Sequence, residues 1–172
     1  SNMQSSCSGT GDLSTNTYLY RWDSGTSTWV TTAFSATNPA IAFARSYIEK
    51  YNAPVRIFNY TVGGTAIAQW QSGGSMYTTI VAYLSAAGNP QVDGVLWHQG
   101  EADSGLSEDG YYAAFYQMVT TYRGLSWFAP RRPWLVGGLY PGSGSTKKQD
   151  NTLRRIGLDG DPHTAYVNAE GL

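Results

Sequence analysis

The sequence predicts an α/β protein, a three-layer α/β/α sandwich in which helices cover both faces of a mostly parallel, doubly wound sheet. Short apolar segments alternate with longer segments of helical spacing, which is the pattern of βαβ units. Glycine and polar residues follow several apolar segments directly, as expected where ligands bind beyond the carboxyl ends of strands. With 172 residues, no internal repeat and no linker, residues 1–172 are expected to form one domain.

The first third of the chain predicts a hairpin followed by a helix and a strand. Residues 18–22 and 28–32 are rich in strand-forming side chains, and Asp23-Ser24-Gly25-Thr26 between them is typical of a hairpin turn. Asn38 before Pro39 is typical of a helix start, and helical spacing continues to about Asn52. Residues 55–60 then predict a strand.

The remaining two thirds continue the alternation. Helices are expected over residues 75–87, from Ser107 onward and over about 146–156, and strands over residues 92–97, 134–139 and 164–167. In the helix that begins at Ser107, the apolar stripe Tyr112, Phe115, Tyr116 and Val119 is interpreted as core. Three strand ends are therefore candidate places for a site: those after Tyr60, Trp97 and Leu139.

Composition argues against several classes of function. The formal net charge is −1 and the basic residues are scattered, so neither nucleic acid nor an anionic membrane surface is an expected partner. No apolar run is long enough to span a bilayer. The single cysteine, Cys7, excludes an intramolecular disulfide, and the two histidines do not form a ligand pair, so no metal site is expected.

The strand predicted at residues 55–60 is followed by Thr61-Val62-Gly63-Gly64-Thr65. Two adjacent glycines let the backbone approach a ligand and turn an N–H group toward it, which an oxyanion-binding site requires. A plain turn is the alternative interpretation of Gly63 and Gly64, and the pair by itself does not decide between the two.

The strand predicted at residues 92–97 is followed directly by a polar cluster, which begins with its last residue: Trp97-His98-Gln99-Gly100-Glu101-Ala102-Asp103. The Gln99 amide is a donor that suits a developing oxyanion. Glu101 and Asp103 are candidates for an acid/base pair, for metal ligands, or for acceptors of loop N–H groups. His98 is a candidate catalyst, and its alternative role is that of a hydrogen-bonded structural histidine.

These two motifs follow Ser1-Asn2-Met3-Gln4 in the order and approximate spacing of one family. The chain resembles the SGNH hydrolases, specifically the sialate O-acetylesterase-like carbohydrate esterases, over nearly its whole length. The resemblance implies a flavodoxin-like SGNH hydrolase fold and a serine esterase that hydrolyses O-acetyl esters of a carbohydrate through an acyl-enzyme, without a cofactor. Trp70, Tyr77 and Trp127 are candidates for stacking on sugar rings.

Carried over residue by residue, the resemblance implies that Ser1 is the nucleophile. The backbone N–H of Gly64 and the side-chain amide of Gln99 join the Ser1 backbone in the oxyanion hole. Glu101 and Asp103 shape and orient their loop rather than act in the triad. The supporting residues are therefore Gly63, His98, Glu101 and Asp103.

The chain departs from the family pattern at both ends. No strand precedes Ser1, and the family's Asp-x-x-His block, which supplies the base and its orienting acid, is absent. Asp159 and Asp161 stand at the wrong spacing from His163, which stays open as a substitute base. We therefore expect a fragment of an esterase, with a sheet incomplete at both ends, that is unstable alone and weakly active or inactive.

Two other functions stay open. The first is a non-catalytic glycan-binding or structural module on the same fold, which the missing base favours. A lipid esterase is less favoured because the chain has no apolar lid. Family habit suggests secretion or the periplasm, whereas the residues themselves indicate neither the compartment nor the oligomeric state.

Overall fold

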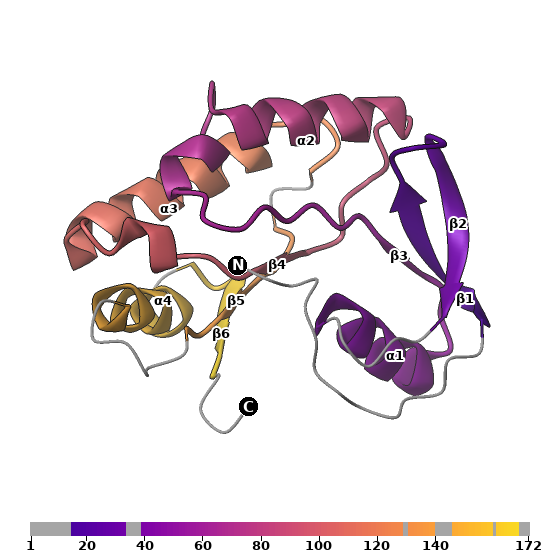
Figure 1. Ribbon diagram of the computed structural model, residues 1–172. Helices are drawn as coiled ribbons and strands as arrows, with labels where there is room; N and C mark the ends of the chain where they lie inside the picture. Colours follow the sequence, from indigo (N-terminus) through magenta and orange to yellow (C-terminus); the bar gives the residue numbers. More distant parts are fainter. Residues whose placement is uncertain (1–14, 34–38, 129–130, 140–145, 160, 169–172) are drawn as a thin grey trace. The chain divides into compact units, whose positions relative to one another are not determined.

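In the computed structural model, residues 15–33, 39–128, 131–139, 146–159 and 161–168 are described (Figure 1). They fall into two compact units, one within Asn2–Gly63 and the other within Gly64–Leu172. Each unit contains parallel strands and at least one helix, so the predicted α/β class is confirmed.

The first unit contains the predicted hairpin. Its strands are β1 (Thr15–Asp23) and β2 (Thr28–Ala33), which pair antiparallel with Trp22 opposite Trp29. The Asp23 side chain accepts a hydrogen bond of 2.9 Å from the Gly25 backbone and so closes the turn. On its other edge β1 pairs in parallel with β3 (Val55–Ile57), which gives the sheet order β2-β1-β3.

Helix α1 (Pro39–Tyr51) packs on this sheet through one apolar stripe. Ile41, Ala44 and Ile48 are buried around Leu19 of β1, with Val55 and Ile57 of β3 against the same cluster. This spacing places all three helix residues on one face, as the sequence predicts. The predicted N-cap Asn38 lies outside the described residues.

The second unit is built on a parallel sheet of order β4-β5-β6. Trp97 of β4 lies opposite Val136 of β5, which in turn lies opposite Tyr166 of β6. Helices α3 and α4 pack side by side against this sheet (Figure 1). The unit's elements in chain order are η1 (Ile67–Trp70), α2 (Ser75–Ala86), β4 (Val95–Trp97), η2 (Glu101–Asp103), α3 (Glu108–Arg123), β5 (Trp134–Gly137), α4 (Lys147–Asp159) and β6 (Thr164–Val167).

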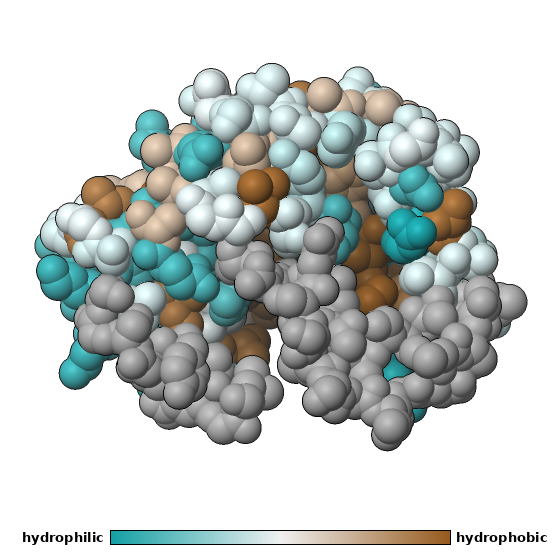
Figure 2. Space-filling view, in the orientation of Figure 1, coloured by the Kyte–Doolittle hydropathy of each residue, from teal (hydrophilic) through white to brown (hydrophobic). Residues whose placement is uncertain are grey.

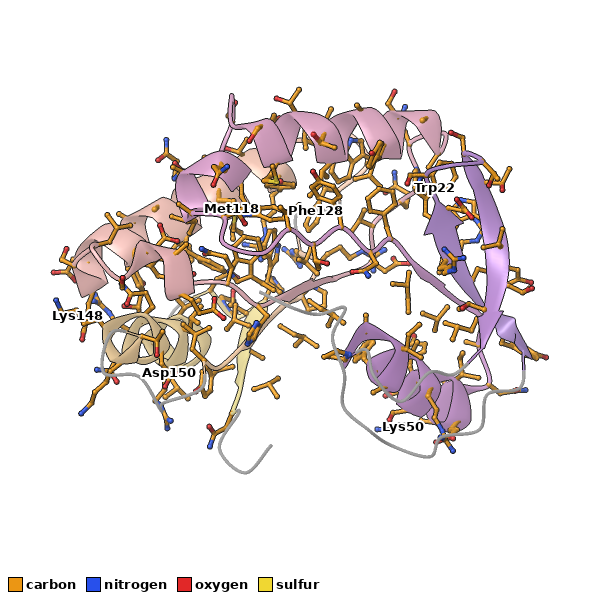
Figure 3. The ribbon with its side chains drawn as sticks, in the orientation of Figure 1. Trp22, Lys50, Met118, Phe128, Lys148 and Asp150 are labelled. Atoms are coloured by element: carbon orange, nitrogen blue, oxygen red, sulfur yellow. The ribbon has the colours of Figure 1, made fainter. Side chains whose placement is uncertain are left out.

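Aromatic side chains form the core of the second unit. Trp134 lies 6.2 Å from Trp97 and 5.9 Å from Phe115, measured between ring centroids. The labelled Met118 and Phe128 belong to the same core (Figure 3). Trp70 and Trp127, two of the predicted sugar-stacking residues, are 6% and 5% exposed, so that prediction is wrong for both. Both rings pack edge-to-face on neighbouring core rings, an arrangement that the quadrupoles of aromatic rings favour.

Helix α3 buries a different stripe from the one predicted. Tyr111, Phe115, Met118, Val119 and Tyr122 face the core, whereas Tyr112 and Tyr116 are only half-buried. Tyrosine has an apolar ring and a polar tip, so the pattern Tyr111-Tyr112 does not reveal which ring faces inward. The prediction is confirmed for Phe115 and Val119, which are buried.

The visible surface over α2 and α3 carries mainly polar or intermediate residues, with hydrophobic ones scattered singly (Figure 2). None of the helices in the described part of the chain is long and apolar enough to cross a membrane.

Candidate active site

The predicted motif Trp97–Asp103 lies at the carboxyl end of β4. Trp97 is the last residue of the strand and is buried, and η2 begins at Glu101. Between them Gly100 has φ of 153° and is itself buried, a backbone conformation that favours glycine. Gln99 before this glycine and Asp103 after it are buried, whereas Glu101 is exposed.

The Gln99 side chain is buried and uses both of its amide hydrogens. Its Nε2 atom donates to the backbone oxygen of Thr65 at 2.8 Å and to Oδ2 of Asp103 at 2.5 Å. The Tyr111 hydroxyl donates to the Gln99 backbone oxygen at 2.7 Å and lies 3.0 Å from Oε1. Burial raises the pKa of the Tyr111 phenol, so this group keeps its proton as a donor.

Asp103 is 6% exposed and serves as an acceptor for two loops. Its Oδ2 atom accepts from the Ile67 backbone at 2.9 Å as well as from Gln99. Glu101 is exposed, so the two carboxylates of the motif lie in different environments. No group of three or more potential metal-ligating side chains was found among the described residues. The loop-acceptor interpretation of Asp103 therefore has direct geometric support.

The glycine pair at residues 63–64 lies on the surface. Gly64 has φ of 72°, and a Cβ atom built on it would meet nothing within 4 Å. The next residue, Thr65, is buried, and its Oγ1 accepts a hydrogen bond of 3.0 Å from the Trp70 indole. Within this unit, the Gln99–Thr65 and Asp103–Ile67 bonds join the segment that begins at Gly64 to the end of β4.

His98 joins the ends of two neighbouring strands. Its Nε2 atom lies 3.2 Å from the backbone oxygen of Gly138, which follows β5. A carbonyl oxygen only accepts, so in this bond Nε2 carries the hydrogen. The geometry supports the structural interpretation of this histidine, and a direct catalytic role for His98 stays a prediction.

Two side chains from the first turn of α4 also hold the site, and the sequence analysis missed both. Fully buried Gln149 donates from Nε2 to the Asp103 backbone oxygen at 2.7 Å. Asp150 accepts from the Leu139 backbone at 2.9 Å and from the Tyr166 hydroxyl at 3.0 Å, and it is labelled in Figure 3. A polar first turn after a strand is the only sequence signal for either residue.

His163 lies at the amino-terminal ends of the parallel strands, whereas the Trp97–Asp103 motif lies at their carboxyl ends. It precedes β6, and its backbone oxygen accepts from the Trp134 backbone at 2.8 Å, at the start of β5. His98 contacts the residue after the end of β5, so a strand of four residues, about 13 Å long, separates the two positions. His163 thus lies away from the Trp97–Asp103 motif, and its role as substitute base stays a prediction. Ser1, the predicted nucleophile, and Cys7 lie outside the described residues.

Comparisons with known proteins show the fold and the family of the chain. A protein of Arabidopsis thaliana, known from an X-ray structure, matches with a TM-score of 0.76 and 22% sequence identity, covering 93% of this chain and 71% of that one. At this identity the match shows a shared fold. A search of curated proteins finds no match. A family model described as a carbohydrate esterase, sialic acid-specific acetylesterase, matches residues 4–172, and the chain therefore belongs to this family of carbohydrate esterases.

Proposed function

We propose that residues 1–172 belong to one SGNH-type esterase domain, in which Ser1 is the nucleophile that removes acetyl groups from sialic acid or another carbohydrate. The observation that carries the proposal is the pair of hydrogen bonds, Gln99 to Thr65 and Asp103 to Ile67, joining two strand-end segments. One of these segments begins at Gly64, where a Cβ atom would meet nothing within 4 Å, and the other belongs to the Trp97–Asp103 motif, on which the resemblance rests.

The proposed reaction has two acyl-transfer steps. The Ser1 hydroxyl gives its proton to a general base and attacks the ester carbonyl. The new O–C bond forms, and the bond to the sugar oxygen breaks as that oxygen takes the proton from the base. Water then attacks the acetyl-serine and releases acetate. The Gly64 backbone N–H stabilises the negative charge on the carbonyl oxygen in both steps. In the family that the chain resembles, an Asp-x-x-His block supplies this base and its orienting acid.

Gln99 is proposed to lie in the same oxyanion site. Both of its amide hydrogens are engaged by Thr65 and Asp103. Direct donation to an oxyanion therefore requires that one of these two bonds be exchanged for a bond to the substrate. The alternative is that Gln99 acts on the reaction indirectly, by holding Thr65 next to Gly64.

The test is an acetate-release assay with the full-length gene product. Acetylated sialic acid, acetylated oligosaccharides and p-nitrophenyl acetate serve as substrates. We expect release by the wild type and loss of more than about a thousandfold in Ser1→Ala, as for removal of a triad nucleophile. Ser85→Ala, on the exposed end of α2, is the matched control and should retain full activity. Activity that survives Ser1→Ala excludes the proposal.

A non-catalytic glycan-binding module is the second candidate. It is favoured by the positions of the two histidines. His98 bonds to a backbone carbonyl, and His163 lies at the amino-terminal ends of the strands, away from the Trp97–Asp103 motif. The same assay separates the two functions. A module of this kind binds acetylated oligosaccharides in calorimetry without releasing acetate.

A further inference from the structure

Three buried side chains, Gln99, Asp103 and Tyr111, form one connected polar network, which we call the bridge network. Asp103 and Gln99 contact each other directly, and the Tyr111 hydroxyl contacts both the backbone and the side chain of Gln99. Tyr111 comes from α3, whereas the other two belong to the segment after β4. Their exposed fractions are 5%, 6% and 0% respectively.

The bridge network meets the segment after Gly64 at two backbone atoms. Gln99 donates to the Thr65 carbonyl, and the Ile67 N–H donates to Asp103, across 34 and 36 residues of sequence. A carboxylate that accepts two N–H groups at one oxygen makes stronger hydrogen bonds than a neutral acceptor. Asp103 thus sets the position of Gln99 and of Ile67 at the same time.

The Gly64 segment depends on such backbone contacts. Gly64 has no side chain, and no heavy atom lies within 4 Å of the position that a Cβ atom would take. The Thr65 carbonyl belongs to the very next residue, so the Gln99 bond acts one residue away from the N–H proposed to bind the oxyanion. Oxyanion donors act only when they are held in place before the charge develops.

We infer that Asp103 and Tyr111 are positioning residues for the esterase reaction: through Gln99 they hold the Gly64 N–H in its catalytic orientation. The inference rests on the proposed function, and within it the Gln99–Thr65 bond links the bridge network to the Gly64 segment. Displacing a catalytic group by about an ångström lowers rates by as much as a hundredfold. Loss of the network should therefore lower kcat and leave substrate binding nearly unchanged.

The experiment compares Asp103→Asn and Tyr111→Phe in the full-length protein with acetylated substrates. Asp103→Asn keeps an acceptor oxygen but loses the charge, and Tyr111→Phe removes one hydroxyl. We expect kcat to fall about tenfold or more in each, with KM within about twofold of wild type. Because the two residues act through one side chain, their effects on kcat should be less than additive in the double variant.

Two matched controls separate positioning from stability. Tyr116→Phe makes the same substitution on α3, but the Tyr116 hydroxyl contacts the Asp161 backbone. Asp161→Asn makes the same charge change, and Asp161 pairs with Arg123 and accepts from the His163 backbone. Because Asp161 is paired with a largely buried cation, its substitution should lower the melting temperature at least as much as Asp103→Asn. Both controls should keep kcat within about twofold.

The outcomes are distinct. A fall in kcat confined to Asp103→Asn and Tyr111→Phe supports the inference. If both variants lose thermal stability but keep wild-type kcat, Asp103 and Tyr111 are structural only and the inference is overturned. If Asp103→Asn does not fold, Tyr111→Phe decides by the same criterion. A wild-type protein that releases no acetate overturns the proposed function first, which is a different result from an active enzyme indifferent to these substitutions.

Discussion

Gly100 and Leu139 approach so closely that a Cβ atom on Gly100 would lie 2.8 Å from Cδ1 of Leu139. The same atom would lie 3.1 Å from Cβ of Gln149. Gly100 ends the segment after β4, Leu139 follows β5, and Gln149 belongs to α4. Three elements thus meet at a backbone position that has no room for a side chain.

Gly100→Ala should therefore destabilise the protein by about 2–4 kcal/mol, because it combines overpacking with a backbone conformation that alanine adopts poorly. Chemical denaturation of the variant measures the change in the free energy of unfolding. Gly105→Ala, where a Cβ would meet nothing within 4 Å, is the control and should change little. An equal loss in both variants would contradict this account of Gly100.

Gly64 presents the opposite case. A side chain there has open space, but φ of 72° disfavours most residues. Gly64→Ala should lower the free energy of unfolding by about 1–2 kcal/mol. Gly64→Asn should lower it less, since asparagine adopts this conformation more readily. Thermal melts of the two variants check the order, and a less stable asparagine variant would show that φ does not control the effect.

Phe115 has no exposed surface and packs against both the Trp97 and the Trp134 rings. Phe115→Ala should destabilise the second unit by about 3–5 kcal/mol, because the cavity left among rigid rings closes only in part. Phe43→Ala, at a 42% exposed position, should change stability by less than about 1 kcal/mol. Denaturant titrations of both variants provide the comparison. A small loss for Phe115→Ala would mean that the aromatic core repacks.

Ser107 caps helix α3. Its Oγ atom accepts a hydrogen bond of 3.0 Å from the Gly110 backbone. Ser107→Ala leaves this N–H group without its capping acceptor and should lower the free energy of unfolding by about 1 kcal/mol. Ser107→Asp retains an acceptor at the helix start and should recover most of the loss. Failure of the aspartate variant to recover stability would argue against the cap.

The raised pKa of Tyr116 predicts that the free energy of unfolding falls at alkaline pH. Burial, together with neighbouring Tyr112, raises the pKa of the Tyr116 phenol from 10.0 to about 12. Above pH 10 the unfolded chain releases this proton while the folded protein keeps it. The stabilisation is therefore fully present below pH 10 and is lost as the pH rises through about 12. Unfolding measured across this range should show a smaller decline for Tyr116→Phe, and an unchanged decline would contradict the assignment.

Local patterns in the sequence predict most of the fold. Residues 75–87 are predicted as a helix, and α2 spans Ser75–Ala86; residues 164–167 are predicted as a strand, and β6 spans Thr164–Val167. The strand predicted at 92–97 is shorter, because β4 begins at Val95 and Val92 makes only an isolated bridge to Phe128. Strand ends depend on which partner atoms lie opposite, which periodicity does not record. The two short 3₁₀ segments, η1 and η2, lack a periodic signal.

The sequence by itself determined the α/β class, the order of the elements and the family, because these depend on side-chain period and on motifs of consecutive residues. Only the tertiary structure decided which atoms the Gln99 amide contacts, that Asp103 serves two loops, and that His163 lies at the amino-terminal ends of β5 and β6. Each of these depends on at least one contact between residues 29 or more positions apart. Such contacts arise when strands align in one register, and the chain's local preferences do not specify that register.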